Sequence, residues 1–331
     1  MADLGIFDDE AFSLSSLTTA INEQPYLPGR VSRLGLFEEE GVQTTTVQIE
    51  KDGDSLVLVK AAERGAPGQR VHGSKRNTIP FNTVHLPQTW TITADEVQGI
   101  RAFGTTTELQ AVQEVVNKRL AKCRRQLDAT HEYQRLGALA GLVIDADGET
   151  VLCDLFNRFG VEQIALSLGL DDAGGDFRER CTEALEQQED VLGNDTPTSV
   201  IALCGRLYWR KLLKNKSVKE TYLNSQQASE LRGDGRADFE FGGINWERYR
   251  GKVNGINFIR DDEALLIPVG VPDLCKTAFA PADYMDTVNS NGLPYYSKQE
   301  RMKFDKGIEG EAQSNPLHIV TRPRSILRLQ M

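Results

Sequence analysis

Hydrophobic residues between positions 105 and 137 recur at the spacing of one face of a long helix. Each is three or four residues from the next: Leu109, Val112, Val116, Leu120, Cys123, Leu127 and His131. Thr105 and Glu108 form a capping box, which predicts a helix over residues 105–137, about 45 Å long. The remaining surface of this helix is basic and is interpreted as a solvated face, with a neighbouring subunit's acids or phosphate as alternative contacts. Its bases are Lys118, Arg119, Lys122, Arg124 and Arg125.

The first 40 residues have the pattern of an arm rather than of a domain. An amphipathic stretch at residues 12–21 predicts a short helix, which Pro25, Pro28 and Gly29 end. Residues 1–50 contain nine acidic and only two basic residues. Because so few apolar residues cannot form a core of their own, we expect this arm to lie on another surface.

Residues 41–92 predict a long loop with strand character at its base. Residues 44–50 alternate and are rich in β-branched side chains, residues 51–54 are typical of a turn, and residues 56–59 provide a returning strand. Residues 61–77 contain much glycine and charge, and extended chain resumes over residues 78–93. Such a long loop indicates either disorder or a surface that another subunit covers.

The rest of the chain mixes hairpins, helices and strands. We expect a hairpin over residues 141–160 with Asp147-Gly148 at its tip, helices over 174–192 and 205–214, and a buried strand over 199–204. Strands are predicted over 239–251 and 258–269, and the paired glycines Gly242-Gly243 are interpreted as a bulge. The last 36 residues are predicted to be extended and to end in a strand. The predicted fold class is therefore α+β.

Composition narrows the classes of protein that fit. The chain has 331 residues, is 40% hydrophobic and 26% charged, and has a formal net charge of −10. This charge excludes a protein that wraps nucleic acid through a basic surface. No apolar run is long enough to span a membrane, and the acidic N-terminus is unlike a signal peptide. Five scattered cysteines without close pairs are expected to be reduced: Cys123, Cys153, Cys181, Cys204 and Cys275.

Motifs for catalysis or cofactor binding are weak in this sequence. The segment GQRVHGSK at residues 68–75 transposes the Lys and Ser of a phosphate loop and leads into extended chain. The segment DADG at residues 145–148 lacks the later acids of a calcium loop. The four histidines have no partners at metal-ligand spacing, and no GxSxG motif occurs. We therefore expect no catalytic, cofactor-binding or metal-binding residues, no cofactor, and a protein that is not an enzyme.

A basic run at residues 210–219 stands apart from the acidic balance of the chain. It contains Arg210, Lys211, Lys214, Lys216 and Lys219. Phosphate is one partner for such a run. In a chain with a net charge of −10, we interpret it instead as balancing acids on an adjacent subunit.

Four stretches of the chain contain distinctive motifs. They are residues 109–141, which end in RLGALAG, the hairpin GLVIDADGETVLCDLF, the run INWERYRG, and the long C-terminal run, which contains APADYM, SNPL and TRPR. Together these stretches resemble the major capsid proteins of tailed bacteriophages, and specifically the lambda-like major capsid protein E family with its HK-97-type fold, in which the last three motifs occur in the same order. The resemblance covers nearly the whole chain.

The resemblance implies a division of the chain that periodicity alone does not give. Residues 1–40 resemble the N-terminal arm and residues 41–92 the extended loop, a β-hairpin. Residues 93–160 and 301–331 resemble the peripheral domain, with the spine helix at 105–137. Residues 161–300 resemble the axial domain, which clusters around the local symmetry axis.

The implied function is that of a structural head protein. Copies would form hexamers and pentamers of an icosahedral shell around double-stranded DNA, which a negative shell would contact only weakly. Implied partners are a separate scaffolding protein, a portal and a decoration protein, with no membrane. The implied location is the virion capsid, assembled in the host bacterial cytoplasm. The alternatives are a cellular nanocompartment shell of the same fold or a cytosolic DNA-associated binding module.

Opposite charges on the two projecting segments give a hypothesis about contacts between subunits. The loop tip has four bases, Arg64, Arg70, Lys75 and Arg76, against the single acid Glu63. The arm is acidic. We therefore expect these bases to meet the arm of an adjacent subunit through its acids, Asp8, Asp9, Glu10, Glu38, Glu39 and Glu40.

Overall fold

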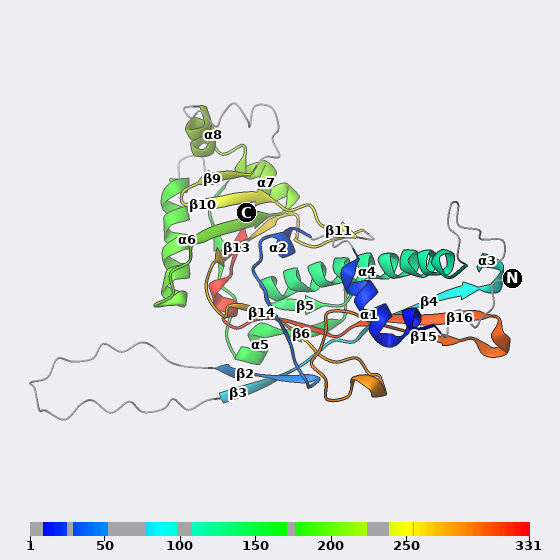
Figure 1. Ribbon diagram of the computed structural model, residues 1–331. Helices are drawn as coiled ribbons and strands as arrows, with labels where there is room; N and C mark the ends of the chain where they lie inside the picture. Colours follow the sequence, from blue (N-terminus) through cyan, green and yellow to red (C-terminus); the bar gives the residue numbers. More distant parts are fainter. Residues whose placement is uncertain are drawn as a thin grey trace, which may run out of the picture. The chain divides into compact units, whose positions relative to one another are not determined.

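The computed structural model describes residues 9–24, 29–51, 77–97, 108–170, 176–223, 238–253 and 255–331. The chain divides into two compact units (Figure 1). Unit 1 comprises residues 1–47, 82–135 and 276–318, and unit 2 comprises residues 48–81, 136–275 and 319–331. The chain therefore passes between the units several times, and each unit is assembled from segments far apart in sequence.

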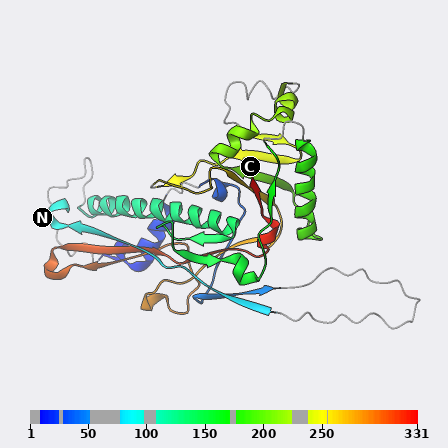
Figure 2. The ribbon, with the colours of Figure 1, turned by 180° about the vertical axis from the view of Figure 1, so that it is seen from behind.

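Unit 1 is built around a three-stranded antiparallel sheet with the order β15-β16-β4. Helix α1 packs on β15, and side chains of α1, α4, β4 and β16 share one apolar cluster. Figure 2 shows these strands and helices from behind. The elements are η2 (Glu10–Phe12), α1 (Leu14–Glu23), α2 (Arg30–Arg33), β4 (Leu86–Thr93), α3 (Ala94–Val97), α4 (Glu108–Ala140, which continues into unit 2), η3 (Met285–Thr287), β15 (Tyr296–Arg301), η4 (Lys303–Asp305) and β16 (Gly307–Ser314).

The long helix α4 confirms the apolar stripe that the sequence predicts. The stripe residues from Val112 to His131 are all buried, at 6% exposure or less. The helix continues past the predicted end at Gly137 and stops at Ala140, because Gly141 adopts a left-handed conformation with φ +82°. A Cβ atom at Gly137 would lie 2.9 Å from the carbonyl oxygen of Leu142, so glycine permits a close approach of the following strand.

The N-terminal helix confirms the predicted amphipathic stretch, and its apolar face is covered within the same unit. Phe12, Leu17 and Ile21 are at most 4% exposed and belong to the cluster with Trp90 and the α4 stripe. The expectation that the arm needs a surface to lie on is thus met by this chain itself for residues 9–24. A neighbouring subunit is not required to bury this helix.

Strand β1 joins the arm to a second small sheet, with the order β1-β14-β17. It runs parallel to β14, with Glu38 opposite Lys276 and Gly41 opposite Phe279. A Cβ atom at Gly41 would lie 2.3 Å from the carbonyl oxygen of Gly292, so the chain passes close to the loop after β14. The strands are β1 (Glu38–Gly41), β14 (Cys275–Phe279) and β17 (Pro316–Val320).

The base of the extended loop pairs differently from the predicted hairpin. Strand β2 (Thr46–Lys51) pairs with β3 (Asn77–Asn82) in a two-stranded sheet, whereas the sequence predicted that residues 44–50 pair with residues 56–59. Those returning residues lie outside the described ranges. The extended chain predicted for residues 78–93 is confirmed as β3 and β4.

Unit 2 contains a six-stranded mixed sheet with the order β7-β18-β13-β8-β10-β9. The central strand β8 pairs parallel with β10 and antiparallel with β13. The predictions for residues 174–192, 199–204 and 205–214 are confirmed as α6, β8 and α7. The elements are β5 (Leu142–Ile144), β6 (Val151–Asp154), α5 (Leu155–Phe159), β7 (Ala165–Ser167), α6 (Phe177–Leu192), β8 (Ser199–Cys204), α7 (Arg206–Leu212), α8 (Lys216–Leu223), β9 (Phe239–Phe241), β10 (Ile244–Arg248), β11 (Lys252–Val253), β12 (Ile256–Asn257), β13 (Glu263–Val269), η5 (Pro323–Ser325) and β18 (Leu327–Gln330).

The paired glycines of unit 2 form a turn and not the predicted bulge. Gly242 and Gly243 connect β9 to β10 with Ile244 opposite Phe241, so they are the two central residues of a hairpin loop. Their φ values of +63° and +79° are those of a turn that favours glycine at both positions. The glycines therefore reverse the chain.

The closing strand of the run 301–331 lies in unit 2. Strand β18 pairs antiparallel with β13 and parallel with β7, which places it inside the large sheet of unit 2. The structure divides this run after His318. Its alternating pattern predicted a strand correctly, but alternation does not specify which sheet a strand joins.

Candidate functional site: the arm anchor and the assembly surfaces

Four charged residues of α4 form a buried row beside its apolar stripe, and we call them the arm anchor: Arg124, Asp128, Glu132 and Arg135. Their spacing of 4, 4 and 3 puts them on one helical face. All four are at most 8% exposed. A charge buried to this degree needs hydrogen-bonding partners, and segments far away in sequence supply them.

Arg124 holds the end of helix α1. Its Nη1 donates to the backbone carbonyl oxygens of Ile21 at 2.6 Å and Asn22 at 2.5 Å. The last carbonyls of a helix have no intrahelical partner, and that end of the helix attracts positive charge. The guanidinium also lies 4.8 Å from the centre of the Tyr295 ring. Arg124 therefore caps α1, which corrects its predicted place on a solvated face.

Glu132 holds the beginning of helix α2. The helix starts after Gly29, which offers no side-chain cap. In its place, the Glu132 carboxylate accepts hydrogen bonds from the backbone N–H of Val31 at 2.8 Å and of Ser32 at 3.3 Å. A Cβ atom at position 29 would lie 2.1 Å from the Glu132 carboxyl carbon. Glycine therefore leaves room for the carboxylate at the helix end that attracts negative charge.

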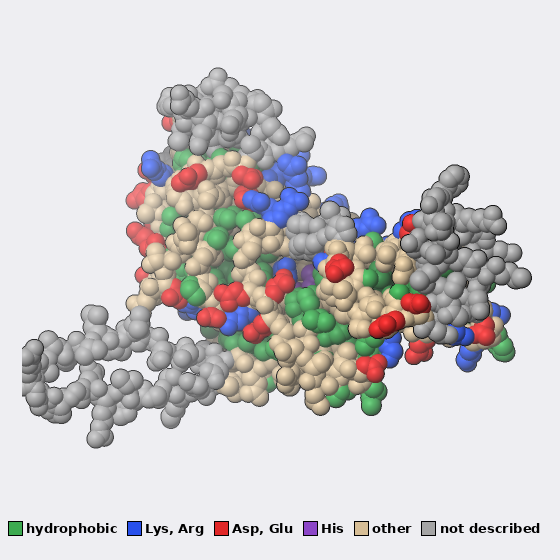
Figure 3. Space-filling view, in the orientation of Figure 1, with side chains coloured by type: hydrophobic (Ala, Val, Ile, Leu, Met, Phe, Trp, Pro, Cys, Tyr) green, Lys and Arg blue, Asp and Glu red, His purple; other side chains and the backbone are tan. Residues whose placement is uncertain are grey.

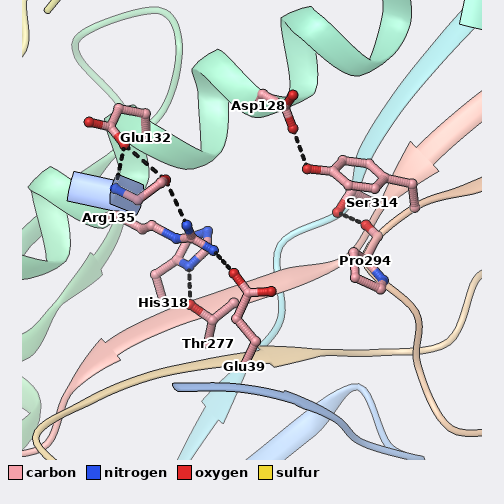
Figure 4. Close-up of polar contacts among 10 residues, drawn as sticks. Glu39, Asp128, Glu132, Arg135, Thr277, Pro294, Ser314 and His318 are labelled. Carbon is pink, nitrogen blue, oxygen red and sulfur yellow. Dashed lines mark hydrogen bonds and ion pairs between the residues drawn. The ribbon is translucent and has the colours of Figure 1, made fainter. Parts of the chain in front are cut away.

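Arg135 ties the arm to the row at a third point. Its Nη1 donates to the Ser32 hydroxyl at 2.8 Å, and its Nη2 donates to Glu39 Oε1 at 2.5 Å. Figure 4 shows Arg135 between Glu132 and Glu39. The Arg135 side chain is 5% exposed and that of Glu39 is 49% exposed. Solvent therefore screens the ion pair from the Glu39 side.

Asp128 completes the row by contacting the strand region of unit 1. Its carboxylate accepts a hydrogen bond from the Tyr295 hydroxyl, and Figure 4 shows Asp128 pointing away from α4. Arg124 Nε lies 3.8 Å from the other carboxylate oxygen. Burial raises the pKa of Asp128, while the Tyr295 hydrogen bond and Arg124 act in the opposite direction. The row thus has two acids between two bases along the helix.

Two buried histidines lie next to the arm anchor. The rings of His131 and His318 are 5.2 Å apart between centroids, and His318 Nδ1 is 2.9 Å from the Thr277 hydroxyl oxygen. Burial, aided by the positive charge of Arg135, lowers the pKa of His131 to about 3. Burial also lowers the pKa of His318, to which His131 and Arg135 add. Both imidazoles are therefore neutral at pH 7.

The polar contacts of the arm anchor serve a structural role. Within the described residues, no group of three or more His, Cys, Asp or Glu side chains is placed to hold a metal ion. The buried polar groups instead bind the two helices of the arm and strand β1.

No helix in the described part of the chain is long and apolar enough to cross a membrane.

Large apolar side chains are exposed on two well-defined elements of unit 1. Met285 is 88% and Val288 is 60% exposed on the loop between β14 and β15. Hydrogen bonds inside this loop fix its shape, because the Thr287 hydroxyl donates to Ala282 at 2.7 Å and the Ser290 hydroxyl donates to Thr287 at 2.7 Å. At the turn between β15 and β16, Phe304 is 89% exposed. These are candidate subunit contacts.

Phe304 also has an unfavourable backbone conformation. Its φ of +63° and the φ of +52° at Asp305 are left-handed values that residues other than glycine rarely adopt. Strain of this kind often occurs at functional positions. The hairpin tip therefore presents a phenyl ring to solvent at a cost in backbone energy.

The basic face predicted for α4 divides into separate environments. Arg119 pairs with Glu96 at 2.7 Å, and both side chains are partly exposed. Arg119 and Lys122 line a groove of about 430 Å³ between α4 and β4, together with Trp90. Lys118 and Arg125 are exposed to solvent. The solvated-face interpretation therefore holds for part of this face, and Arg124 is its clear exception.

The predicted contact residues have different locations. Asp9 caps η2 by accepting from the Ala11 N–H at 2.9 Å, and Glu10 is exposed beside it. Glu38 and Glu40 are exposed on β1, while Glu39 pairs with Arg135. The structure does not bring Asp9 and Glu10 onto the same element as the β1 acids. The other predicted contacts lie outside the described residues: Asp8, Arg64, Arg70, Lys75 and Arg76.

Sequence reasoning missed the arm anchor as a unit. A signal was available, because the four residues follow helical spacing, with two acids between two bases. The same spacing occurs on solvated faces that carry ion pairs. What distinguishes the anchor is its burial by the arm, whose contacts lie about a hundred residues away in sequence.

Comparison with known proteins relates nearly the whole chain to one protein family. The model of the family described as "Phage major capsid protein E" matches residues 13–331. The major capsid protein of Salmonella phage Felix O1 (isolate Felix O1-VT1) is 28% identical over 352 residues, covering 96% of this chain and 95% of that protein. The major capsid protein of Pseudomonas phage KPP10 is 25% identical over 338 residues, covering 96% of each.

A solved structure shows the same fold. The crystal structure of a protein assigned to the capsid of a prophage of E. coli CFT073 superposes with a TM-score of 0.58 at 17% identity. It covers 96% of this chain and 99% of the other. The fold is thus shared over nearly the full length of both chains.

Proposed function

Since the chain belongs to the phage major capsid protein E family, we propose how its copies assemble into a capsid shell. Family membership identifies a structural protein of the virion capsid with the HK-97-type fold, and not an enzyme. We propose hexamers and pentamers as building units of an icosahedral shell that encloses the double-stranded DNA of a tailed phage. The sequence alternatives, a nanocompartment shell and a DNA-associated module, gain no support from the family match.

The observation that supports this assembly most strongly is the exposure of large apolar side chains on fixed elements. Met285 and Phe304 are each almost fully exposed in the single chain. Exposed apolar side chains that gather on one surface often mark a contact with another protein, and Met285 shares its loop with Val288, which is 60% exposed. We propose that neighbouring copies bury both residues.

We assign roles to the segments as the family resemblance implies. Residues 1–40 act as the arm, residues 41–92 as the extended loop over a neighbour, and residues 93–160 with the spine helix as the peripheral domain. Residues 161–300 act as the axial domain around the local symmetry axis. Because β18 belongs to the sheet of unit 2, we assign the strand at the end of residues 301–331 to the axial domain instead.

The loop tip and the arm of adjacent subunits are proposed to meet through opposite charges. The double change Arg70→Glu and Arg76→Glu is expected to weaken assembly more at low than at high ionic strength. The matched control is Lys118→Glu with Arg125→Glu, which reverses two exposed bases of α4. If the loop variant assembles like wild type at both salt concentrations, this contact is wrong.

Further partners follow from the same role. A separate scaffolding protein, a portal and a decoration protein are the proposed partners, with assembly in the bacterial cytoplasm. The net charge of −10 supports only weak contact with packaged DNA, because like charges repel. Proposed inner-surface contacts with DNA are accordingly few.

The direct test is the assembly state of the purified chain. Size-exclusion chromatography and negative-stain microscopy should reveal shells, ring-shaped capsomers or tubes. The changes Met285→Ser and Phe304→Ser should each reduce assembly while leaving the circular dichroism spectrum unchanged, because both side chains are exposed in the single chain. A chain that remains a stable monomer under all assembly conditions would contradict the proposal.

A further inference from the structure

Two exposed helical faces of unit 2 have opposite charges. The face of α7, α8 and the turn between them exposes five bases and one acid, Glu220; the bases are Arg206, Arg210, Lys214, Lys216 and Lys219. Helix α6 exposes one base, Arg178, and five acids; the acids are Glu179, Glu183, Glu186, Glu189 and Asp190. In Figure 3, acidic side chains follow the edge where Figure 1 places α6, and basic side chains gather near α7.

The acidic face of α6 is unfavourable for the helix that carries it. Glu179 and Glu183 are four residues apart, as are Glu186 and Asp190, and like charges at this spacing repel. Glu189 and Asp190 also lie in the last turn, which has no base. That end of a helix favours positive charge. The sequence of α6 thus departs from the pattern that would stabilise it in a single chain.

Neither face is neutralised within the described residues. None of the five α6 carboxylates forms an ion pair with another described residue, and the same is true of Arg206, Arg210 and Lys214. Lys216 contacts only Glu220, at 3.8 Å, with both side chains largely exposed. The opposite face of α6 is already used, because Phe177, Cys181 and Ala184 are buried in the core of unit 2.

We propose that the basic face of α7 and α8 docks against the acidic face of α6 in a second copy of this chain. Because the two faces are different surfaces of one unit, the contact is heterologous and repeats from copy to copy, as in a closed ring. The inference rests on the assembly proposed above and names the surfaces that join neighbours. A phosphate ligand would pair with the basic face only, and the acids of α6 would then have no partner.

A charge-swap experiment tests this contact. Arg210→Glu with Lys214→Glu reverses the basic face, and Glu183→Lys with Glu186→Lys reverses the acidic face. Each double variant is expected to lower the yield of capsomers by about tenfold or more, since like charges then face each other. The quadruple variant restores the complementarity and should recover most of the yield. Reversal of Lys118 and Arg125 on α4 serves as the control and should have little effect.

A cross-linking measurement gives a second readout that does not depend on the variants folding. Capsomers of the wild-type chain assembled from mixed ¹⁴N- and ¹⁵N-labelled copies are treated with a zero-length carbodiimide. Peptides that join Lys214 or Lys219 to carboxylates of α6 should include pairs of one light and one heavy chain, because the link joins two copies.

For the charge-swap variants, circular dichroism verifies that each one retains its fold before its yield is compared.

The outcomes separate this contact from the wider proposal. Normal yield in either double variant, a folded quadruple variant without recovery, or the absence of mixed-isotope cross-links would overturn the contact. Loss of DNA binding with normal assembly would assign the basic face to phosphate instead, and would also overturn it. If the wild-type chain forms no capsomers at all, the proposed assembly itself fails.

Discussion

The core of unit 2 and the arm anchor of unit 1 are both buried, but they differ in what holds them together. In unit 2, Trp209 and Trp246 pack with Tyr208 and with apolar side chains of the six-stranded sheet. In unit 1, the anchor buries charges that each meet a partner from the arm or the strands. Apolar packing has little directional preference, whereas a buried charge accepts only a partner in the right place.

The two regions therefore contribute differently: apolar packing mainly stabilises the fold, whereas the buried charges mainly fix the position of the arm. Burying an ion pair often adds little net stability, but removing one partner leaves an uncompensated charge and costs several kcal/mol. The arm has one correct position on α4 because Arg124 and Glu132 hold opposite ends of two different helices. The apolar core of unit 2 lacks such a requirement, so its response to change should scale mainly with the volume removed.

The largest effect is expected from a cavity in the core of unit 2. Trp246→Ala removes a fully buried side chain that stacks with Tyr208, packs against the tilted ring of Phe177 and donates to the Phe241 carbonyl at 3.1 Å. The free energy of unfolding should fall by about 4 kcal/mol in urea denaturation. Leu207→Ala, at a 41% exposed position of α7, is the control and should change it little. Equal losses in the two variants would refute the apolar-core account.

Removing one charge of the arm anchor should have the next largest effect. Glu132→Ala leaves the N–H groups of Val31 and Ser32 without an acceptor and removes the negative charge beside Arg135. We expect a loss of about 3 kcal/mol, with faster amide exchange in residues 29–41. Glu132→Gln keeps an acceptor and should lose less. Glu114→Gln, exposed on the same helix, should behave as wild type, and a similar loss there would show that the anchor is not special.

Acidification should weaken unit 1 more than the core of unit 2. The unfolded chain protonates His131 near its ordinary pKa of 6.5, but the folded chain does so only near 3. The unfolded state therefore binds more protons in this window, and the stability present at pH 7 is lost as the pH falls below 6.5. His131 alone contributes a loss of about 2 kcal/mol between pH 7 and pH 5.

Asp128 acts in the opposite direction in this experiment. Its raised pKa means that the folded state binds the proton more readily, so protonation of Asp128 offsets part of the histidine effect at lower pH. Thermal unfolding at pH 7, 6 and 5 measures the sum. His131→Phe should flatten the dependence even if it lowers the overall stability. An unchanged slope in this variant would show that His131 is not responsible.

The smallest effect is expected from a substitution of Gly29, which leaves room for the Glu132 carboxylate. Gly29→Ala suits the backbone φ of −63° but forces the Glu132 carboxylate to move. The expected cost is about 1 kcal/mol, measured as a small shift in the urea midpoint. Combining Gly29→Ala with Glu132→Gln should cost less than the sum of the two changes, because both act on the same contact. Full additivity would contradict a direct clash.

The elements could be predicted from the sequence, but their long-range partners could not. Periodicity was sufficient for α4, and alternation was sufficient for β2 and β18, because both patterns are local. The pairing of β1 with β14 and of β18 with β7 and β13 joins segments that are far apart in sequence. The turn at Gly242 and Gly243 was mistaken for a bulge because two glycines permit either conformation.

The candidate site was less predictable than the fold for the same reason. The charges of Arg124, Asp128 and Glu132 are visible in the sequence, but their partners are backbone groups of the arm and the Tyr295 hydroxyl. Backbone groups carry no sequence signature. The prediction that the arm needs a surface was correct in its physical reasoning, yet the surface for residues 9–24 is this chain's own α4 and β15.

Amide hydrogen exchange of unassembled subunits shows whether the arm is anchored within its own chain. We predict that the backbone N–H groups of residues 17–23 and 31–34 are already protected in the single subunit at pH 7, because α4 holds the arm in place. We also predict that this protection falls in Glu132→Ala. Rapid exchange of these residues in free subunits, with protection only in assembled shells, would contradict anchoring within the chain.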